Sequence, residues 1–367
     1  MIAFSKIKKL FQIKSLIILS LIAATIKLFE QFLKGRYFHD FEVYFEAIKT
    51  LNNDGNPYIS SLDLPYPYPP LISNILSNFD PEIFSFFYIS IYITLIFLLY
   101  FLSNKKFRIS YLISIGISGI LIKSLLTGNI INIFYILLIF SIIYHFKYKN
   151  FLPFYICVFF MSLIKFNFII LFLLPLLVNK NFKKELINFI IGISIISLIY
   201  LYQYKYMNIE FMNFFEVLKS LNTADHGSSL FSFLNYKINL SIYLSIILHS
   251  SLFIFLIGFV LLKKNEMNSN LYFLIILVLL IFFNPRLKLY DVGFGLVLLN
   301  VAILYFSKKI ILNFYKFNII FIFIFKLISK NFALNLDNPK LLSWYIFILF
   351  IYFFLKKYSN LKIIKPN

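Results

Sequence analysis

The chain has 367 residues, of which 61% are hydrophobic and only 14% are charged, and its formal net charge is +20. A soluble domain cannot bury apolar runs of this density, so the composition excludes a soluble protein and indicates an all-α polytopic membrane protein. The single cysteine, Cys157, excludes an internal disulfide and gives no information about the compartment.

Apolar runs of roughly spanning length, about 14 to 23 residues, recur along the whole chain. They predict about twelve transmembrane helices, with eleven or thirteen as alternatives. We expect one integral membrane domain over residues 1–367, with no separate soluble domain. The first run lacks a small-residue cleavage site, so we expect it to remain as a membrane helix. The expected spans are 15–33, 83–103, 109–125, 129–146, 151–164, 166–179, 186–203, 240–262, 270–284, 292–307, 317–330 and 342–355.

The basic residues are distributed unevenly between the loops. With twelve spans, one side of the membrane collects both termini and most of the lysines, and its only acidic residues are Glu185 and Glu266. The other side is close to neutral. The positive-inside rule then places the termini in the cytoplasm, and the positive charge requires no nucleic-acid partner.

The first extracytoplasmic loop, residues 35–82, is the longest polar stretch. In its segment DFEVYFEAIKTLNNDGNPY the apolar residues recur every three or four positions, which predicts an interfacial amphipathic helix over about 41–54. Asp40 is placed as the N-cap of this helix, and the prolines of PYPYPP predict a stiff, extended segment before the next span. The apolar positions are Phe41, Tyr44, Phe45, Ile48 and Leu51.

Asp40 has a second interpretation besides capping. A carboxylate just outside a membrane span is well placed to take a proton from an acceptor hydroxyl, as a general base does. A second extracytoplasmic loop, residues 204–239, contains His226, which we consider as a contact for an acceptor sugar or as a solvated loop histidine.

The loop that begins at Asp40 resembles the first extracytoplasmic loop of glycosyltransferase family 87, the DUF2029-type, polyprenol-phosphate-mannose-dependent alpha-mannosyltransferases. Three later segments are similar to elements of that family: LLTGNIINIFYILL, MSLIKFNFIILFLLPLL and FFNPRLKLYDVGFGL. In the first two, Asn129 replaces the usual glutamine and Phe166 replaces a proline. The matching positions of the first loop are Asp40, Tyr44, Ala47, Gly55, Pro57, Tyr58, Tyr66, Tyr68, Pro69 and Pro70.

The resemblance implies the multi-helical GT-C fold in a bacterial cytoplasmic membrane. It also implies transfer of a hexosyl residue, most plausibly mannosyl, from a polyprenyl-phosphate carrier to an extracytoplasmic glycan or glycolipid, with inversion. Asp40 is then the general base. Lys165, Arg286 and Lys288 are expected to bind the donor phosphate, because buried cations in a membrane protein require an anion and arginine recognises phosphate well.

The remaining candidates would line a substrate groove. Tyrosine faces can stack on sugar rings, although interfacial tyrosine belts and helix-packing amides also occur without a ligand. No cofactor is expected; a divalent cation held by Asp40, Glu42 and Asp63 would be possible but has no support from ligand spacing. The candidate groove residues are Glu42, Tyr44, Tyr58, Tyr66, Tyr68, Asn129, Asn132, Tyr290 and His226.

Two other classes of function remain open from the sequence. A transporter or flippase for lipid-linked saccharides would also place cations near a polar cavity, but the internal symmetry of many transporters is not visible. An oligosaccharide polymerase or ligase would favour a large late extracytoplasmic loop, whereas the turn at 284–291 is short. The donor sugar and the acceptor are not determined by the sequence.

Overall fold

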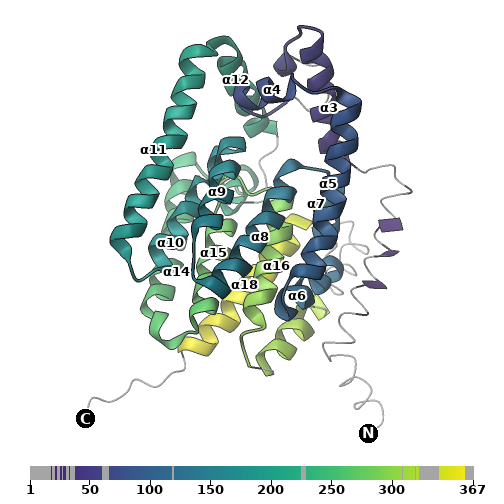
Figure 1. Ribbon diagram of the computed structural model, residues 1–367. Coiled ribbons are helices and arrows are strands. Elements are labelled where there is room, and N and C mark those ends of the chain that lie inside the picture. The colour runs from purple at the N-terminus through teal and green to yellow at the C-terminus, as the bar shows by residue number, and fades with distance from the viewer. Residues whose placement is uncertain are drawn as a thin grey trace, which may run out of the picture.

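The computed structural model forms a bundle of helices, with short helices gathered at one end (Figure 1). No strand occurs in the part of the chain that the structure describes. The described residues are 38–59, 66–117, 120–224, 229–307, 309–318, 320–321 and 339–359, with isolated positions between 18 and 33.

Long apolar helices identify a membrane-embedded protein. Within the described residues, four helices are long and apolar enough to cross a bilayer, and their outward faces carry exposed isoleucine, leucine and phenylalanine. Lipid is the medium that stabilises such surfaces. The four are α5 (Pro81–Leu102), α8 (Ile130–Tyr148), α11 (Phe182–Tyr206) and α14 (Ile242–Leu262).

Two of the expected spans are not single straight helices. The run at 109–125 forms two helices, α6 (Lys105–Ile117) and α7 (Ile120–Leu126), which are inclined by 88° and would give a fifth span only if counted together. The run at 166–179 divides into a 3-10 helix, η2 (Phe166–Phe172), and α10 (Leu173–Val178).

Pro175 explains where α10 begins. It lies in the first turn of α10, where its missing N–H costs no helical hydrogen bond, so the proline favours a helix start just before it.

Three further apolar helices are short. The helices α9 (Leu152–Ile164), α15 (Ser269–Phe282) and α16 (Leu289–Ile303) have 13 to 15 residues, less than a full crossing. Both α15 and α16 are almost wholly buried. The count of twelve spans therefore stays a prediction. The expected runs 15–33 and 317–330 lie largely outside the described residues, and α18 (Pro339–Ser359) covers the last expected run.

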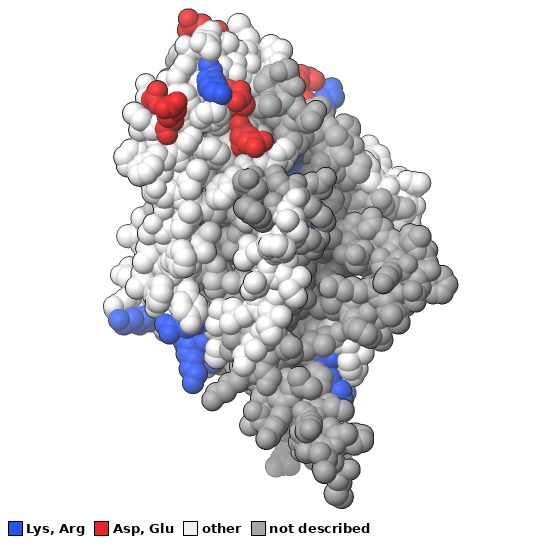
Figure 2. Space-filling model, turned by 90° about the vertical axis from the view of Figure 1, so that its right-hand side faces the viewer, with Lys and Arg blue, Asp and Glu red and all other residues white. Residues whose placement is uncertain are grey.

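Charge is segregated along the bundle. Figure 2 shows acidic side chains gathered at the end that carries α3 (His39–Asn52), whereas lysine and arginine side chains gather at the opposite end. The N-terminus of α6 lies toward that second end and contributes Lys105, Lys106 and Arg108. This asymmetry is the one expected from the loop composition.

The end with α3 is a cap of small elements. The chain there forms η1 (Pro57–Ile59), α4 (Pro70–Leu76) and α12 (Asn208–Ala224), and α12 packs against both η1 and α4. After α12 the chain forms α13 (Leu230–Ser232) and a π-helical turn, η3 (Phe233–Lys237). Later in the chain, the short helix η4 (Lys264–Glu266) connects α14 with α15. The side chain of Gln203, on α11, accepts a hydrogen bond from the backbone of Leu71 at 2.9 Å and thereby fixes α4 to the bundle.

The predicted helix over 41–54 is observed, but its start differs. Phe38, in a left-handed conformation with φ 55°, is the N-cap of α3, and Asp40 is the second helical residue. The N-cap assignment of Asp40 is therefore wrong. The predicted extended proline segment is also shorter than expected, because Pro70 is the first residue of α4, a position that suits the fixed φ of proline.

Candidate functional site

The start of α3 and three turns of the chain lie close together. The first of these is the α7–α8 turn at 127–129, where Thr127 O accepts a hydrogen bond from the backbone N–H of Asp40 at 2.8 Å. The other two are the break between α9 and η2 at Lys165 and the α15–α16 turn at 284–288. The site thus draws on distant parts of the sequence.

Asn129 holds the Asp40 carboxylate. Its Nδ2 donates to Asp40 Oδ2 at 2.8 Å, while its Oδ1 accepts the backbone N–H of Ile131 at 3.0 Å as the N-cap of α8. Because the cap fixes which end of the amide is the acceptor, the other end must present its donor to Asp40. Asp40 itself is half-buried, whereas Asn129 is buried.

Two buried tyrosines extend this network. The hydroxyl groups of Tyr44 and Tyr68 lie 2.6 Å apart, and the Tyr44 hydroxyl also accepts the backbone N–H of Ile130 at 3.0 Å. Burial raises the pKa of the Tyr68 phenol, and the negative charge of Asp40 raises this pKa further. Tyr68 therefore stays protonated and can serve as a hydrogen-bond donor at neutral pH.

Lys165 lies on the other side of Tyr68. Its ammonium group is 5.6 Å from the centre of the Tyr68 ring and 4.3 Å from that of Tyr290, and it donates a hydrogen bond to the Tyr290 hydroxyl. Such cation–π contacts partly replace the water that a half-buried ammonium loses. The charges that act on Lys165 come from Asp291, Asp40, Arg286 and Lys288.

The turn that carries Arg286 is fixed by two asparagines. The Oδ1 of Asn284 accepts the backbone N–H of Arg286 at 3.1 Å and the Nδ2 of Asn167 at 3.0 Å. Asn167 belongs to η2, so this pair joins the Lys165 segment to the Arg286 turn. Arg286 and Lys288 are both half-buried, and Arg286 also interacts electrostatically with Tyr68.

Asp291 belongs to the segment FFNPRLKLYDVGFGL, which resembles the family, but it was not among the predicted site residues. It is 1% exposed, accepts the Tyr135 hydroxyl at 2.9 Å, and accepts the backbone N–H of Lys288 at 2.7 Å. A buried carboxylate requires such partners, and its charge offsets that of Lys165. The available signal was its position three residues after Lys288 at the start of a helix.

Three tyrosines of the first loop pack against one another. Tyr58, Tyr66 and Tyr68 are buried, with ring centres 5.6 Å apart for Tyr58–Tyr66 and 5.2 Å apart for Tyr66–Tyr68. The Tyr58 hydroxyl also donates to the backbone oxygen of Tyr68 at 2.8 Å. These tilted ring contacts and the hydrogen bond pack the loop together, and the stacking of these rings on a sugar stays a prediction.

Other expected groove residues lie elsewhere. The side chain of Asn132 is buried and bonds to Tyr92 and Ser124, so it packs α8 against α5 and α7. Glu42 is 67% exposed and pairs with the exposed His39 at 3.6 Å. The remaining candidate, His226, lies outside the described residues.

The described residues offer no cluster of metal ligands. Among the residues with described positions, no three His, Cys, Asp or Glu side chains lie close enough together to hold a metal ion. Asp63, which was one of the three carboxylates considered for a divalent cation, lies outside them. The charged groups of this region are the carboxylate of Asp40 on one side and, on the other, the cations Lys165, Arg286 and Lys288 together with the buried carboxylate of Asp291.

Comparison of the chain with protein-family models gives no match, and comparisons with curated proteins and with solved structures give none either.

Proposed function

We propose that this membrane protein is an inverting glycosyltransferase that moves a hexosyl residue from a polyprenyl-phosphate carrier to a hydroxyl group of a glycan or glycolipid. The observation that carries the proposal is the placement of Asp40, a half-buried carboxylate held by Asn129, next to the cations Lys165, Arg286 and Lys288. Transfer from a phosphate leaving group requires these two parts, a base and an anion site.

The proposed reaction is a single displacement. The free oxygen of the Asp40 carboxylate takes the proton of the acceptor hydroxyl as the acceptor oxygen bonds to C1 of the donor sugar. The bond between C1 and the phosphate oxygen breaks at the same time, and its electron pair stays on the phosphate. Lys165, Arg286 and Lys288 stabilise the charge of that phosphate. Attack opposite the leaving group inverts the anomeric centre.

The surroundings support a fixed base. One oxygen of Asp40 is engaged by Asn129, whose amide is itself fixed by the cap of α8. Tyr68, which lies between Asp40 and Lys165, separates the proposed base from the proposed anion site, so the two opposite charges do not neutralise each other by direct pairing. Such preorganisation is the usual source of electrostatic catalysis.

The proposed location follows from the charge distribution. We place the α3 end of the bundle outside the cytoplasm and the basic end, with both termini, in the cytoplasm of a bacterial cell, in accordance with the positive-inside rule. The donor lipid would then reach the site from the outer leaflet. We also propose that α3 lies in the membrane interface and that the fold is of the GT-C type.

The test is transfer of a labelled sugar by the purified protein in lipid. A synthetic polyprenyl-phosphate mannose is offered with a panel of glycan and glycolipid acceptors, and the anomeric configuration of the product is read by nuclear magnetic resonance. The proposal expects an inverted product. Movement of the donor lipid across vesicles without a new glycosidic bond would instead establish the flippase alternative, and use of a lipid-diphosphate donor would establish the polymerase or ligase alternative.

A further inference from the structure

A surface groove with apolar walls and a polar mouth lies toward the end of the bundle opposite Asp40. A cavity of about 820 Å³ runs between α9 and α11, with Phe172 at its back. Its apolar walls include Ile156 and Ile191, which are 50% and 51% exposed, so it is a groove that opens sideways on the surface of the bundle. The helix α11 stands along one outer edge of the bundle in Figure 1.

The length of the groove matches one membrane leaflet. On α11 its lining runs from Lys184 and Glu185 to Ile195. Ten residues separate Glu185 from Ile195, which corresponds to about 15 Å along a helix axis. The hydrocarbon core of a bilayer is about 30 Å thick. The groove therefore accommodates an acyl chain from one leaflet and is too short for a long polyprenyl chain.

The polar mouth of the groove lies at the basic end and carries two exposed lysines, Lys149 and Lys184. The buried carboxylate of Glu185 also lies there, and its oxygens accept hydrogen bonds from Tyr155, from Asn179 at 2.6 Å and from Asn188 at 3.3 Å. The carboxylate is thus satisfied by Tyr155 and the two asparagines rather than by the lysines. Both lysines are exposed, and Lys149 Nζ makes a long hydrogen bond to Asn270 Oδ1 at 3.4 Å.

The charge at this mouth favours an anion. Lys180 and Lys183 are also exposed just before Lys184, so the region stays positive when Glu185 is counted. A zwitterionic lipid headgroup has no net charge and does not match this excess. A lipid whose phosphate carries an uncharged alcohol has a net negative charge and does match it. Basic pockets between membrane helices on one side of a bilayer bind anionic headgroups in this way.

We propose that this groove binds an anionic phospholipid of the leaflet on the basic side. One acyl chain lies between α9 and α11, and the phosphate contacts Lys149 and Lys184. The site is separate from the Asp40 site and does not rest on the proposed transfer reaction.

The test compares phosphatidylglycerol with phosphatidylcholine of identical acyl chains by native mass spectrometry of the full-length protein in detergent. At equal concentrations, we expect phosphatidylglycerol adducts to exceed phosphatidylcholine adducts by about fivefold. The double variant Lys149→Gln/Lys184→Gln should bring this ratio close to one. The matched control Lys183→Gln, on the same turn of α11 but outside the groove lining, should keep the wild-type ratio.

A second pair of variants tests the chain site. Ile191→Trp fills the groove and should remove one bound lipid of either kind, whereas Ile187→Trp, an equally exposed position on α11 outside the lining, should not. Helix content and gel filtration verify folding, and Ile156→Trp on the opposite wall replaces Ile191→Trp if that variant aggregates. Equal binding of both lipids by the wild type, equal loss in variant and control, or displacement of phosphatidylglycerol by an equal amount of polyprenyl phosphate would each overturn the proposal.

Discussion

Asn129 Nδ2 donates a hydrogen bond to Asp40 Oδ2 at 2.8 Å across 89 residues of sequence. The same asparagine caps α8 through Oδ1, so one side chain connects the start of a buried helix with the proposed base. Its replacement therefore affects two separable properties, helix stability and the orientation of Asp40.

Asn129→Ser separates these two properties. Serine is also a good N-cap, so we expect the free energy of unfolding to stay within about 0.5 kcal/mol of the wild-type value. The donor to Asp40 is lost, and sugar transfer should fall about tenfold in kcat with little change in donor KM. Asn129→Ala, which loses both functions, should in addition lower stability by about 1 kcal/mol. Equal kcat in the serine variant and the wild type would show that Asp40 needs no positioning by Asn129.

Gly128→Ala should destabilise the turn that presents Asn129. Gly128 has φ +68°, and a Cβ there would lie 2.7 Å from Cδ1 of Phe38, the residue that caps α3. We expect the free energy of unfolding to fall by about 1 to 2 kcal/mol, measured by thermal denaturation in detergent. Gly258→Ala is the control, because a Cβ at this position of α14 meets nothing within 4 Å. The control should be neutral or slightly stabilising, and an equal loss in both variants would contradict the expectation.

Arg286→Lys tests the proposed phosphate contact. The charge is kept but the planar fork of donors is lost, so donor KM should rise about tenfold while the acceptor KM stays unchanged. Lys165→Gln should raise donor KM and also lower kcat, since it removes a charge that faces the leaving phosphate. Lys49→Gln is the control, because Lys49 is exposed and pairs with Glu46 at 3.1 Å. A rise in acceptor KM instead of donor KM would assign the cations to the acceptor.

The orientation in the membrane can be measured with single cysteines. Asn53 and Lys183 are exposed at opposite ends of the bundle, while the native Cys157 is buried. In intact cells, a membrane-impermeant maleimide should label Asn53→Cys and should label Lys183→Cys only after the membrane is opened. The reverse pattern would invert the topology and remove the outer leaflet as the source of the donor.

The charged residues of the site were easier to predict from the sequence than the residues that hold them in place. Asp40, Lys165 and Arg286 are separated by more than a hundred residues from one another, yet each stands out as a charge next to apolar runs and each reaches the same site. Asn129 and Asp291 were harder to interpret, because their partners, Asp40 and Tyr135, come from other segments, and an amide or a helix-start carboxylate is common in any membrane helix.

In the fold, too, features that depend on local sequence were predicted, and features that depend on packing were not. The spacing of apolar residues predicted the helix α3 and three of its buried residues, Phe41, Tyr44 and Ile48, since helical periodicity is a local property. Hydropathy did not predict the bend between α6 and α7 or the 3-10 segment at Phe166–Phe172, because buried short helices are as apolar as spanning ones. The packing of Tyr58 against Tyr66 was not predicted for a similar reason: composition does not show which rings contact one another.

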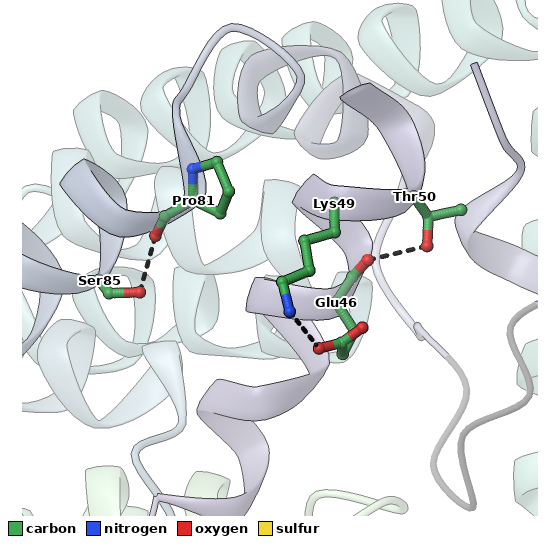
Figure 3. A network of polar contacts seen from close by, with 5 residues as sticks. All are labelled: Glu46, Lys49, Thr50, Pro81 and Ser85. Carbon is green, nitrogen blue, oxygen red and sulfur yellow. Dashed lines mark hydrogen bonds and ion pairs between the residues drawn. The ribbon is translucent and has the colours of Figure 1, made fainter. Parts of the chain in front are cut away.

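The proposed base has a matched control on its own helix. Figure 3 shows Glu46 and Lys49 pointing toward one another on α3, with Thr50 bonded to the backbone of Glu46 and Ser85 to that of Pro81 on the neighbouring α5. Glu46 thus pairs locally at the surface, while Asp40 turns toward the α7–α8 turn.

Turnover of labelled polyprenyl-phosphate mannose by Asp40→Asn, Asp40→Ala and Glu46→Gln is the most direct measurement. Both Asp40 variants should lose transfer by about 10²-fold or more, since the proton acceptor is absent, while they bind the donor as the wild type does. Glu46→Gln should retain wild-type turnover. If Asp40→Asn keeps wild-type turnover, Asp40 is not the base.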